Sequence, residues 1–308
     1  MQFGIMLPHY RHLASTENIK RISQEAEEMG FSSLWITDRT IIFPGEDQDK
    51  FGTIFYDPFA TLAYVAAITN NILLGESVIV VPYRNPFMLA RMTATIDILS
   101  NGRHIFGVGV SGGTDYTRDE FRLIKTPMEN RGLMTDEAIE VMIELWINKF
   151  PSFKGRFWEF ENFCFEPKPL QKPYPPIWIG GNRLVGLKRV IKYGDAWHPS
   201  TIDLVTLEAG VKYLRQELPK HGRDFDKMNI APRESIKILE HPSSRSDFPL
   251  IGDLSQIMNS FEQYQNIGAT HMVLDTFFGR SGLQDETIDS MLFTMESIAE
   301  NIIPVFQE

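Results

Sequence analysis

Residues 177–199 read IWIGGNRLVGLKRVIKYGDAWHP and contain an apolar run, an amphipathic helical stretch and a second apolar run. An apolar run of this length that passes through two glycines into a helical pattern is typical of a buried strand followed by a helix. A strand, a helix and a second strand in succession form a β–α–β unit, whose strands are parallel. This segment therefore predicts a parallel α/β fold.

The same alternation occurs along the whole chain. Apolar runs bounded by Gly, Pro, Asp or Asn predict strands at 3–7, 34–37, 72–81, 104–110, 177–180, 196–199, 235–239 and 272–275. Helical patterns lie at 18–29, 59–68, 87–99, 135–146, 184–192, 204–218, 254–266 and 287–302. Since eight such units close a barrel, we predict an α/β fold of the (β/α)₈ TIM barrel type, formed by a single domain over residues 1–308.

Four long irregular segments interrupt the alternation, at 40–56, 111–130, 148–176 and 241–253. Segments of this length in a compact domain are usually lids or binding loops. Those after the second, fourth and seventh predicted strands would open on the C-terminal face of the barrel, where the active sites of this fold lie. We therefore expect long loop insertions at that face.

Composition limits the partners. The chain has 40 acidic and 30 basic residues, a net charge of −10 and no cluster of Lys and Arg, which argues against nucleic acid and anionic membranes as partners. No apolar run approaches the roughly 18 residues of a membrane-spanning helix and no leader is visible, so we expect a cytoplasmic protein. The single cysteine, Cys164, can form neither an intrachain disulfide nor a metal cage, and no metal site is predicted.

The turn after the fifth predicted strand is a candidate phosphate site, formed by Gly180, Gly181, Asn182 and Arg183. Glycines let backbone N–H groups approach an anion, and the following helix adds the positive end of its dipole. Asn182 and Arg183 can donate from their side chains. The alternative is a tight turn that needs glycine for its backbone conformation alone.

Residues 107–112, GVGVSG, match the G-x-G-x-x-G pattern of dinucleotide-binding proteins. The match is weak because loop-like residues follow it and the next predicted strand begins only at Ile177. A nicotinamide site stays a minor alternative. We favour the interpretation that these glycines let a flat ring lie against the end of the fourth strand.

Polar residues at strand ends are candidate catalytic groups. His9, Asp38 and His198 follow or end the first, second and sixth predicted strands, and histidine exchanges protons near neutral pH. Each could instead be structural, as a buried histidine or as an aspartate in an ion pair or helix cap. Glu76 interrupts an apolar strand, so it either has a buried partner or belongs to the site. A G-x-S-x-G elbow and a Schiff-base lysine are not evident, which argues against hydrolase and aldolase chemistry.

An ordered series of short motifs runs through most of the chain. PYRNP (82–86), ARMTATIDILSNGR (90–103) and GVGV (107–110) are followed by RG (131–132), TDE (135–137), LW (145–146), FKGR (153–156), PKPLQ (167–171), PPIWIGG (175–181) and GDAWHP (194–199). This series resembles the bacterial luciferase-like family, and most of all its deazaflavin-dependent oxidoreductases. The resemblance is specific for the family and much less so for the substrate.

The resemblance implies an enzyme that binds the deazaflavin F420 or FMN at the C-terminal face, with a non-prolyl cis peptide behind the ring. The matching bond here joins Ser77 and Val78, and Gly109 and Val110 are expected beside the same ring. The phosphate end is expected at residues 180–183. Family members are commonly homodimers, and the predicted helices 59–68 and 87–99 are expected to pair between two copies.

One departure from the family pattern affects the chemistry. Deazaflavin-dependent members have an Asp-His pair after the second strand, where this chain has Asp38-Arg39. A guanidinium does not exchange protons near neutral pH, so Arg39 could instead compensate an anionic ring.

The cofactor decides between the functions that remain open. We predict hydride transfer between F420 and a small organic substrate, because a deazaflavin carries hydride and activates oxygen poorly. An FMN-dependent monooxygenase that uses O₂ is the first alternative, and a non-enzymatic flavin-binding barrel is the second.

Overall fold

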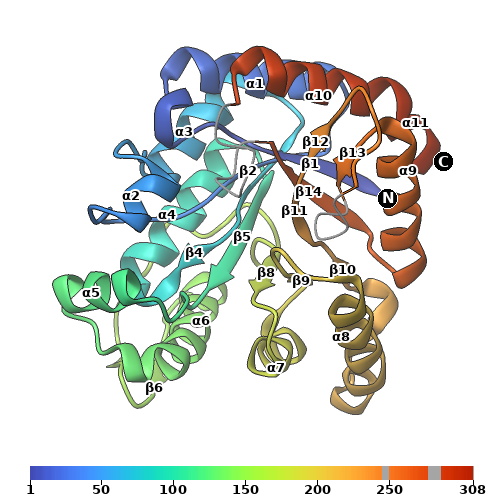
Figure 1. Cartoon of the computed structure of the whole chain (residues 1–308). Helices are drawn as coiled ribbons and strands as arrows, with labels where there is room; N and C mark the ends of the chain where they lie inside the picture. The colour runs from blue at the N-terminus through green and yellow to red at the C-terminus, as the bar shows by residue number, and fades with distance from the viewer. Residues whose placement is uncertain (245–249, 277–285, 308) are drawn as a thin grey trace.

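The structure, a computed structural model, has an α/β architecture and describes residues 1–244, 250–276 and 286–307. Its main sheet is parallel and curled, with helices around the outside (Figure 1). In sheet order the strands are β10 (Asn229–Ile230), β9 (Ala196–His198), β8 (Ile177–Gly180), β5 (His104–Gly109), β3 (Leu73–Glu76), β2 (Ser33–Ile36), β1 (Gln2–Met6), β14 (His271–Asp275) and β11 (Arg233–Ser235), and β4 (Ile79–Val80) also pairs with β5. The predicted parallel α/β fold is confirmed.

The helices alternate with the strands along the chain. They are α1 (Thr16–Glu28), α2 (Glu46–Phe51), α3 (Pro58–Ile68), α4 (Pro86–Leu99), α5 (Asp115–Ile124), α6 (Arg131–Ile147), α7 (Leu184–Tyr193), α8 (Leu204–Glu217), α9 (Leu254–Ile267), α10 (Ile288–Asn301) and α11 (Ile303–Phe306). Five 3₁₀ turns among the described residues are η1 (Arg11–Leu13), η2 (Val81–Tyr83), η3 (Met128–Asn130), η4 (Leu218–His221) and η5 (Phe225–Lys227). Local signals fix several helix ends: Asp57 caps α3 by accepting the N–H of Ala60 at 2.9 Å.

The two ends of the strand order are joined by one short segment. β10 and β11 are separated only by Ala231 and Pro232. The N–H of Ala231 donates to the carbonyl of Trp197 in β9 at 2.8 Å, and the N–H of Val273 in β14 donates to the carbonyl of Pro232 at 2.9 Å. Residues 229–235 therefore link both edges of the curled sheet.

The seventh strand lies earlier in the sequence than predicted. Residues 235–239 were expected to form it, but β11 ends at Ser235, and β12 (Lys237–Ile238) pairs with β13 (Ile251–Gly252) in a separate small sheet. The prediction fails because the true strand contains Arg233 and Glu234, which are buried as polar side chains at the strand end. An apolar run does not mark such a strand.

All four predicted irregular segments contain regular structure, and the fourth, 241–253, includes β13. Residues 40–56 include α2, residues 111–130 include α5 and η3, and residues 148–176 include a hairpin of β6 (Phe153–Lys154) and β7 (Glu159–Phe160). Of the fourth segment, 241–253, residues 245–249 lie outside the described residues. The prediction of 111–130 as a loop is thus wrong over α5, a short helix whose buried residues Thr117, Glu120 and Phe121 are mostly polar.

Trp35 fills the interior of the sheet. Its side chain is fully buried, and its indole N–H donates to Ser33 at 2.7 Å. A Cβ on Gly75 would lie 2.4 Å from the Trp35 ring, and one on Gly4 would lie 2.5 Å from its nitrogen. The neighbouring strands therefore carry glycine because the large side chain occupies the space that theirs would need.

Candidate active site

The bend between β3 and β4 lies at the centre of the site. The peptide bond between Ser77 and Val78 is cis, as the family resemblance predicts. Three groups from other strands hold Ser77: its N–H donates to the carbonyl of Ile36 at 2.6 Å, its hydroxyl lies 2.7 Å from Nε2 of His198, and its carbonyl accepts Nη1 of Arg233 at 2.8 Å. The bend is thus fixed from β2, β9 and β11.

The glycines of β5 and β8 make room for this bend. A Cβ on Gly107 would lie 1.6 Å from the carbonyl oxygen of Glu76, and one on Gly109 would lie 2.3 Å from Cγ2 of Val78. A Cβ on Gly180 would lie 3.2 Å from Cγ1 of Val78. Close backbone packing therefore explains the G-x-G pattern of β5 without a dinucleotide. The same contacts bring the ends of β3, β5 and β8 together.

His9 is a buried link between two strand ends. Its Nδ1 lies 2.9 Å from the carbonyl oxygen of Leu7, and its Nε2 lies 3.0 Å from the carbonyl oxygen and 3.1 Å from the amide nitrogen of Thr37. Burial lowers the pKa of His9 from 6.5 to about 4. The imidazole is therefore neutral at pH 7, with both nitrogens bonded to the main chain.

His198 is held in the same way. Its Nδ1 lies 2.5 Å from the carbonyl of Ala231, so its Nε2 accepts the hydroxyl of Ser77. Its ring stacks on Trp35 with the centroids 5.2 Å apart. Burial lowers the pKa of His198 to about 4. Its side-chain partner is Ser77, and within the described ranges His198 forms no hydrogen bond with His9 or Asp38.

Asp38 forms a buried ion pair. Its carboxylate accepts both terminal nitrogens of Arg84 and the N–H of Val80 at 2.9 Å. Burial opposes the charge of Arg84, but the hydrogen bonds with Asp38 outweigh it and raise the pKa of Arg84. Asp38 thus ties the end of β2 to the residues after the bend.

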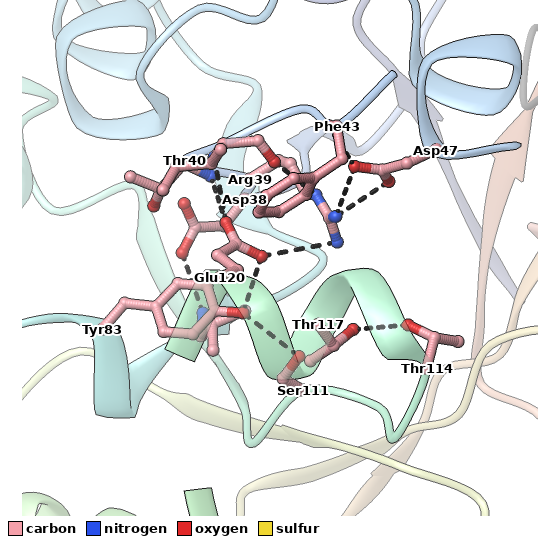
Figure 2. A network of polar contacts seen from close by, with 12 residues as sticks. Asp38, Arg39, Thr40, Phe43, Asp47, Tyr83, Ser111, Thr114, Thr117 and Glu120 are labelled. Atoms are coloured by element: carbon pink, nitrogen blue, oxygen red, sulfur yellow. Dashed lines mark hydrogen bonds and ion pairs between the residues drawn. The ribbon is translucent and has the colours of Figure 1, made fainter. Parts of the chain in front are cut away.

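Arg39 lies at the centre of a second network, drawn in Figure 2. Its Nη2 donates to both carboxylate oxygens of Asp47, at 2.8 and 2.7 Å, and its Nη1 lies 3.5 Å from Glu120. The rings of Phe51 and Tyr116 lie 5.3 and 4.7 Å from the guanidinium carbon. The charge of Arg39 is therefore taken up by two carboxylates and two aromatic rings of the protein itself.

Glu120 connects this network to the end of β4. The side chain comes from α5, is fully buried and accepts the N–H groups of Thr40 and Ile41 at 2.9 and 3.0 Å. Its other oxygen accepts the hydroxyl of Tyr83 at 2.8 Å (Figure 2). Burial raises the pKa of Tyr83, so it remains a phenol at neutral pH.

The structure adds site residues that the sequence did not indicate. Arg233 and Asp275 form a buried ion pair, with Nη2 and Oδ2 2.5 Å apart, and Arg233 also bonds Ser77. Both charges act on the phenol of buried Tyr10, whose pKa is raised above all by burial. Asp275 ends a strand that was predicted, so its position alone was a signal. Arg233 lay outside the predicted strand.

Glu76, left open between two roles, has a buried partner. Its Oε1 lies 2.9 Å from Nε2 of His104, and its Oε2 accepts the N–H of Gly107 at 3.2 Å. Both side chains are fully buried. Glu76 therefore connects β3 to β5.

The turn after β8 stays exposed. The side-chain amide of Asn182 is hydrogen-bonded to Ser200, after the next strand. It donates to the carbonyl of Ser200 at 2.9 Å and accepts the N–H of Ser200 at 3.2 Å. Gly181 has a φ of 104°, a region that favours glycine. Arg183 precedes α7 and is exposed. The turn thus offers backbone N–H groups and one cationic side chain to solvent.

The described part of the chain contains no group of three or more His, Cys, Asp or Glu side chains placed to hold a metal ion. None of the helices in residues 1–244, 250–276 and 286–307 is long and apolar enough to span a membrane.

A curled parallel sheet with polar groups at its carboxyl ends defines a TIM-barrel-like enzyme architecture. The sequence profile of the luciferase-like monooxygenases matches residues 1–242. The chain belongs to this family, whose members include flavin-dependent and F420-dependent enzymes.

A flavin-dependent relative supports the assignment to this family. The chain is 26% identical over 245 residues to the oxygenase component of the flavin-dependent trigonelline monooxygenase of Acinetobacter baylyi, a match that covers 78% of this chain and 64% of that protein. The match therefore spans less than two thirds of that relative.

Solved structures show the same fold. The monooxygenase RslO1 from Streptomyces bottropensis is 18% identical, with a TM-score of 0.83 over 99% of this chain and 100% of that one. An F420-dependent secondary alcohol dehydrogenase, solved with an F420-acetone adduct, is 17% identical, with a TM-score of 0.80 over 100% and 99%. At these identities the likeness concerns the fold.

Proposed function

We propose that the protein is an oxidoreductase that transfers a hydride between the deazaflavin F420 and a small organic substrate. The site would lie at the carboxyl ends of the strands of a (β/α)₈ barrel formed by one cytoplasmic domain, with the segments after β2 and β5 as its loop insertions. The observation that carries the proposal is the packing of Val78 against the positions of Gly109 and Gly180, which brings the residues proposed to contact the ring next to the turn proposed to hold the anion.

The residues present fit a flat ring with an anionic tail. No heavy atom lies within 4 Å of a Cβ built on Gly181, so the backbone of the turn is open to a ligand. The first N–H groups of α7 have no acceptor within the helix, and Arg183 adds a positive charge. The buried hydroxyl of Thr276, at the end of β14, has no partner within the described ranges. Ser77, Val78, Gly109 and Val110 would contact the ring, while Gly180, Gly181, Asn182 and Arg183 would hold the tail.

F420 supplies a two-electron hydride carrier that activates oxygen poorly. The protein fixes the geometry around it. His198 orients the hydroxyl of Ser77, His9 holds the main chain at Thr37, and Asp38 holds Arg84. Because both histidines are neutral at pH 7, we propose that His9, Asp38 and His198 support the reacting edge through their positions rather than by exchanging protons.

Cofactor titration tests the proposal. The purified protein would be titrated with F420 and with FMN, in oxidised and reduced forms, and binding followed by fluorescence. Gly181→Val should weaken F420 binding at least tenfold, because a β-branched side chain blocks the approach to the backbone. Gly222→Val is the matched control, since Gly222 also has positive φ and open space around its Cβ. Equal affinities in the wild type and both variants would contradict the anion site.

An FMN-dependent monooxygenase is the second candidate. It is favoured by the trigonelline monooxygenase relative and by the fold of RslO1. Reduced FMN supplies the reaction with O₂ that a deazaflavin lacks. Tight binding of FMN in preference to F420, with oxygen consumption by the reduced complex, would select this candidate and reject the first.

We further propose a homodimer formed through α3 and α4. An apolar hollow lies between these helices, lined by Phe59, Ala63, Met88, Arg91, Met92, Thr95 and Ile96. Met88, which lines the hollow, and Leu99, at the end of α4, are each 60% exposed. A second copy would remove these apolar side chains from water. Met88→Glu should dissociate the dimer in analytical ultracentrifugation, whereas Val205→Glu, at an exposed apolar residue of α8, should not.

A further inference from the structure

We propose that Glu120 sets the direction of the Tyr83 hydroxyl and thereby selects a substrate that presents an O–H or N–H donor. The inference rests on the proposed redox function, because it concerns the substrate side of the same site. It assigns a specificity role to Tyr83 and a positioning role to Glu120.

The donors around Glu120 leave one direction for the hydroxyl proton of Tyr83. The N–H groups of Thr40 and Ile41 donate to one carboxylate oxygen, and the guanidinium of Arg39 lies 3.5 Å from the other. All of these groups can only donate, so they hold Glu120 as an acceptor. The hydroxyl of Tyr83 gives its single proton to Glu120 at 2.8 Å. What Tyr83 then offers to any other group is its oxygen lone pairs.

The Tyr83 hydroxyl lies beside Ser111, close in the chain to the end of β5 where the proposed cofactor ring would lie. Tyr83 ends η2, which follows β4 directly, and Ser111 comes two residues after Gly109. The hydroxyl oxygens of Tyr83 and Ser111 are 3.4 Å apart, and both residues are half-buried (Figure 2). At that distance Ser111 is a weak donor that a ligand O–H or N–H can replace.

Arg39 and Asp47 prevent Glu120 from turning away. Asp47 accepts two bonds from Arg39 and the N–H of Phe43 at 2.9 Å, and Arg39 donates to the carbonyl of Ile41 at 3.1 Å. The segment after β2 is therefore bonded to itself and to α5 through buried groups. Rotation of Glu120 would leave two N–H groups without their acceptor, which makes the direction of the Tyr83 proton a fixed property of the site.

Alcohols and ketones distinguish the two directions of the Tyr83 O–H bond, toward Glu120 or toward the substrate. An alcohol can donate to Tyr83, whereas a ketone has only acceptor oxygens and would face the lone pairs of Tyr83. We expect wild-type protein loaded with F420, or with FMN if only FMN binds, to bind cyclohexanol about tenfold more tightly than cyclohexanone. Both affinities would be measured by saturation-transfer NMR titration, independently of turnover.

Glu120→Gln should change this preference. Its amide oxygen can accept the N–H groups of Thr40 and Ile41, and its NH₂ group would then donate to Tyr83, whose own proton must turn toward the substrate. The variant should therefore bind cyclohexanone at least as tightly as cyclohexanol, and Tyr83→Phe should bind both with similar affinity. Asp119→Asn, on the exposed side of α5, should keep the wild-type preference.

Each result has a defined meaning. Near-UV circular dichroism and cofactor affinity close to wild type would show that Glu120→Gln is folded. If F420 or FMN binds but the wild type shows no preference, binds neither probe, or keeps its preference in Glu120→Gln, this inference is overturned, whereas the choice between the two candidate functions is decided by cofactor binding alone. If neither cofactor binds, the proposed function fails first.

Discussion

The segment after β2 and the turn after β8 each place an arginine at the carboxyl ends of the strands, but in opposite surroundings. The side chain of Arg39 is 9% exposed and paired with Asp47 and Glu120. Arg183 is exposed, and within the described ranges it has no ion pair. A charge can be buried only with a partner, so the protein neutralises Arg39 and leaves Arg183 available to a ligand anion. In the proposed site the first region would contribute shape, and the second would contribute charge.

Removal of a buried partner should have the largest effect. Glu120→Ala leaves Arg39 with one carboxylate, and leaves two N–H groups and the hydroxyl of Tyr83 without their acceptor. We expect the free energy of unfolding to fall by about 3–5 kcal/mol. Urea unfolding measures this, with Asp119→Ala as the exposed control on the same helix, expected within about 0.5 kcal/mol of wild type. Similar losses in both variants would mean that the network is not a stabilising unit.

The second-largest effect is expected from acid, which should lower the free energy of unfolding through buried His9. The pKa of His9 is lowered from 6.5 to about 4, so between these values the unfolded chain binds the proton and the folded chain does not. The stabilisation is present above pH 6.5 and is lost as the pH falls toward 4, by up to about 3 kcal/mol. His9→Asn keeps a donor for Leu7 and should reduce the pH dependence of the unfolding free energy by about one proton. An unchanged slope in His9→Asn would show that His9 is not held neutral.

The smallest effect on stability is expected at the exposed turn after β8. Arg183→Gln should leave the free energy of unfolding within about 0.5 kcal/mol of wild type, because the side chain is exposed. The same change should weaken cofactor binding about tenfold, and more at low salt, because it removes a charge-assisted bond to an anion. Lys188→Gln, on the exposed face of α7, controls for net charge. If both variants lost affinity to the same degree, the effect would come from the net charge of the protein rather than from a contact at the turn.

The sequence predicted the parts of the site that depend on local pattern. Alternating apolar and amphipathic stretches predicted the parallel sheet, and the motif series predicted the bend at Ser77-Val78. The polar groups of the network were missed for a different reason. Glu120 lies in a helix within a segment that the sequence predicts as a loop, and Arg233 lies in a strand whose polar residues do not form an apolar run. Partners of both are distant in sequence: Glu120 is 80 residues from Thr40, and Arg233 is 156 residues from Ser77.

The sequence by itself determined the fold class, the family and the glycine turn, because backbone preferences and apolar periodicity act within a few residues. Only the tertiary structure decided what each charged group does. Asp38-Arg39 reads as one polar pair along the chain, yet Asp38 binds Arg84 and Arg39 binds Asp47. The role of a buried charge depends on the partner that neutralises it, and that partner is set by which strand ends the fold brings together.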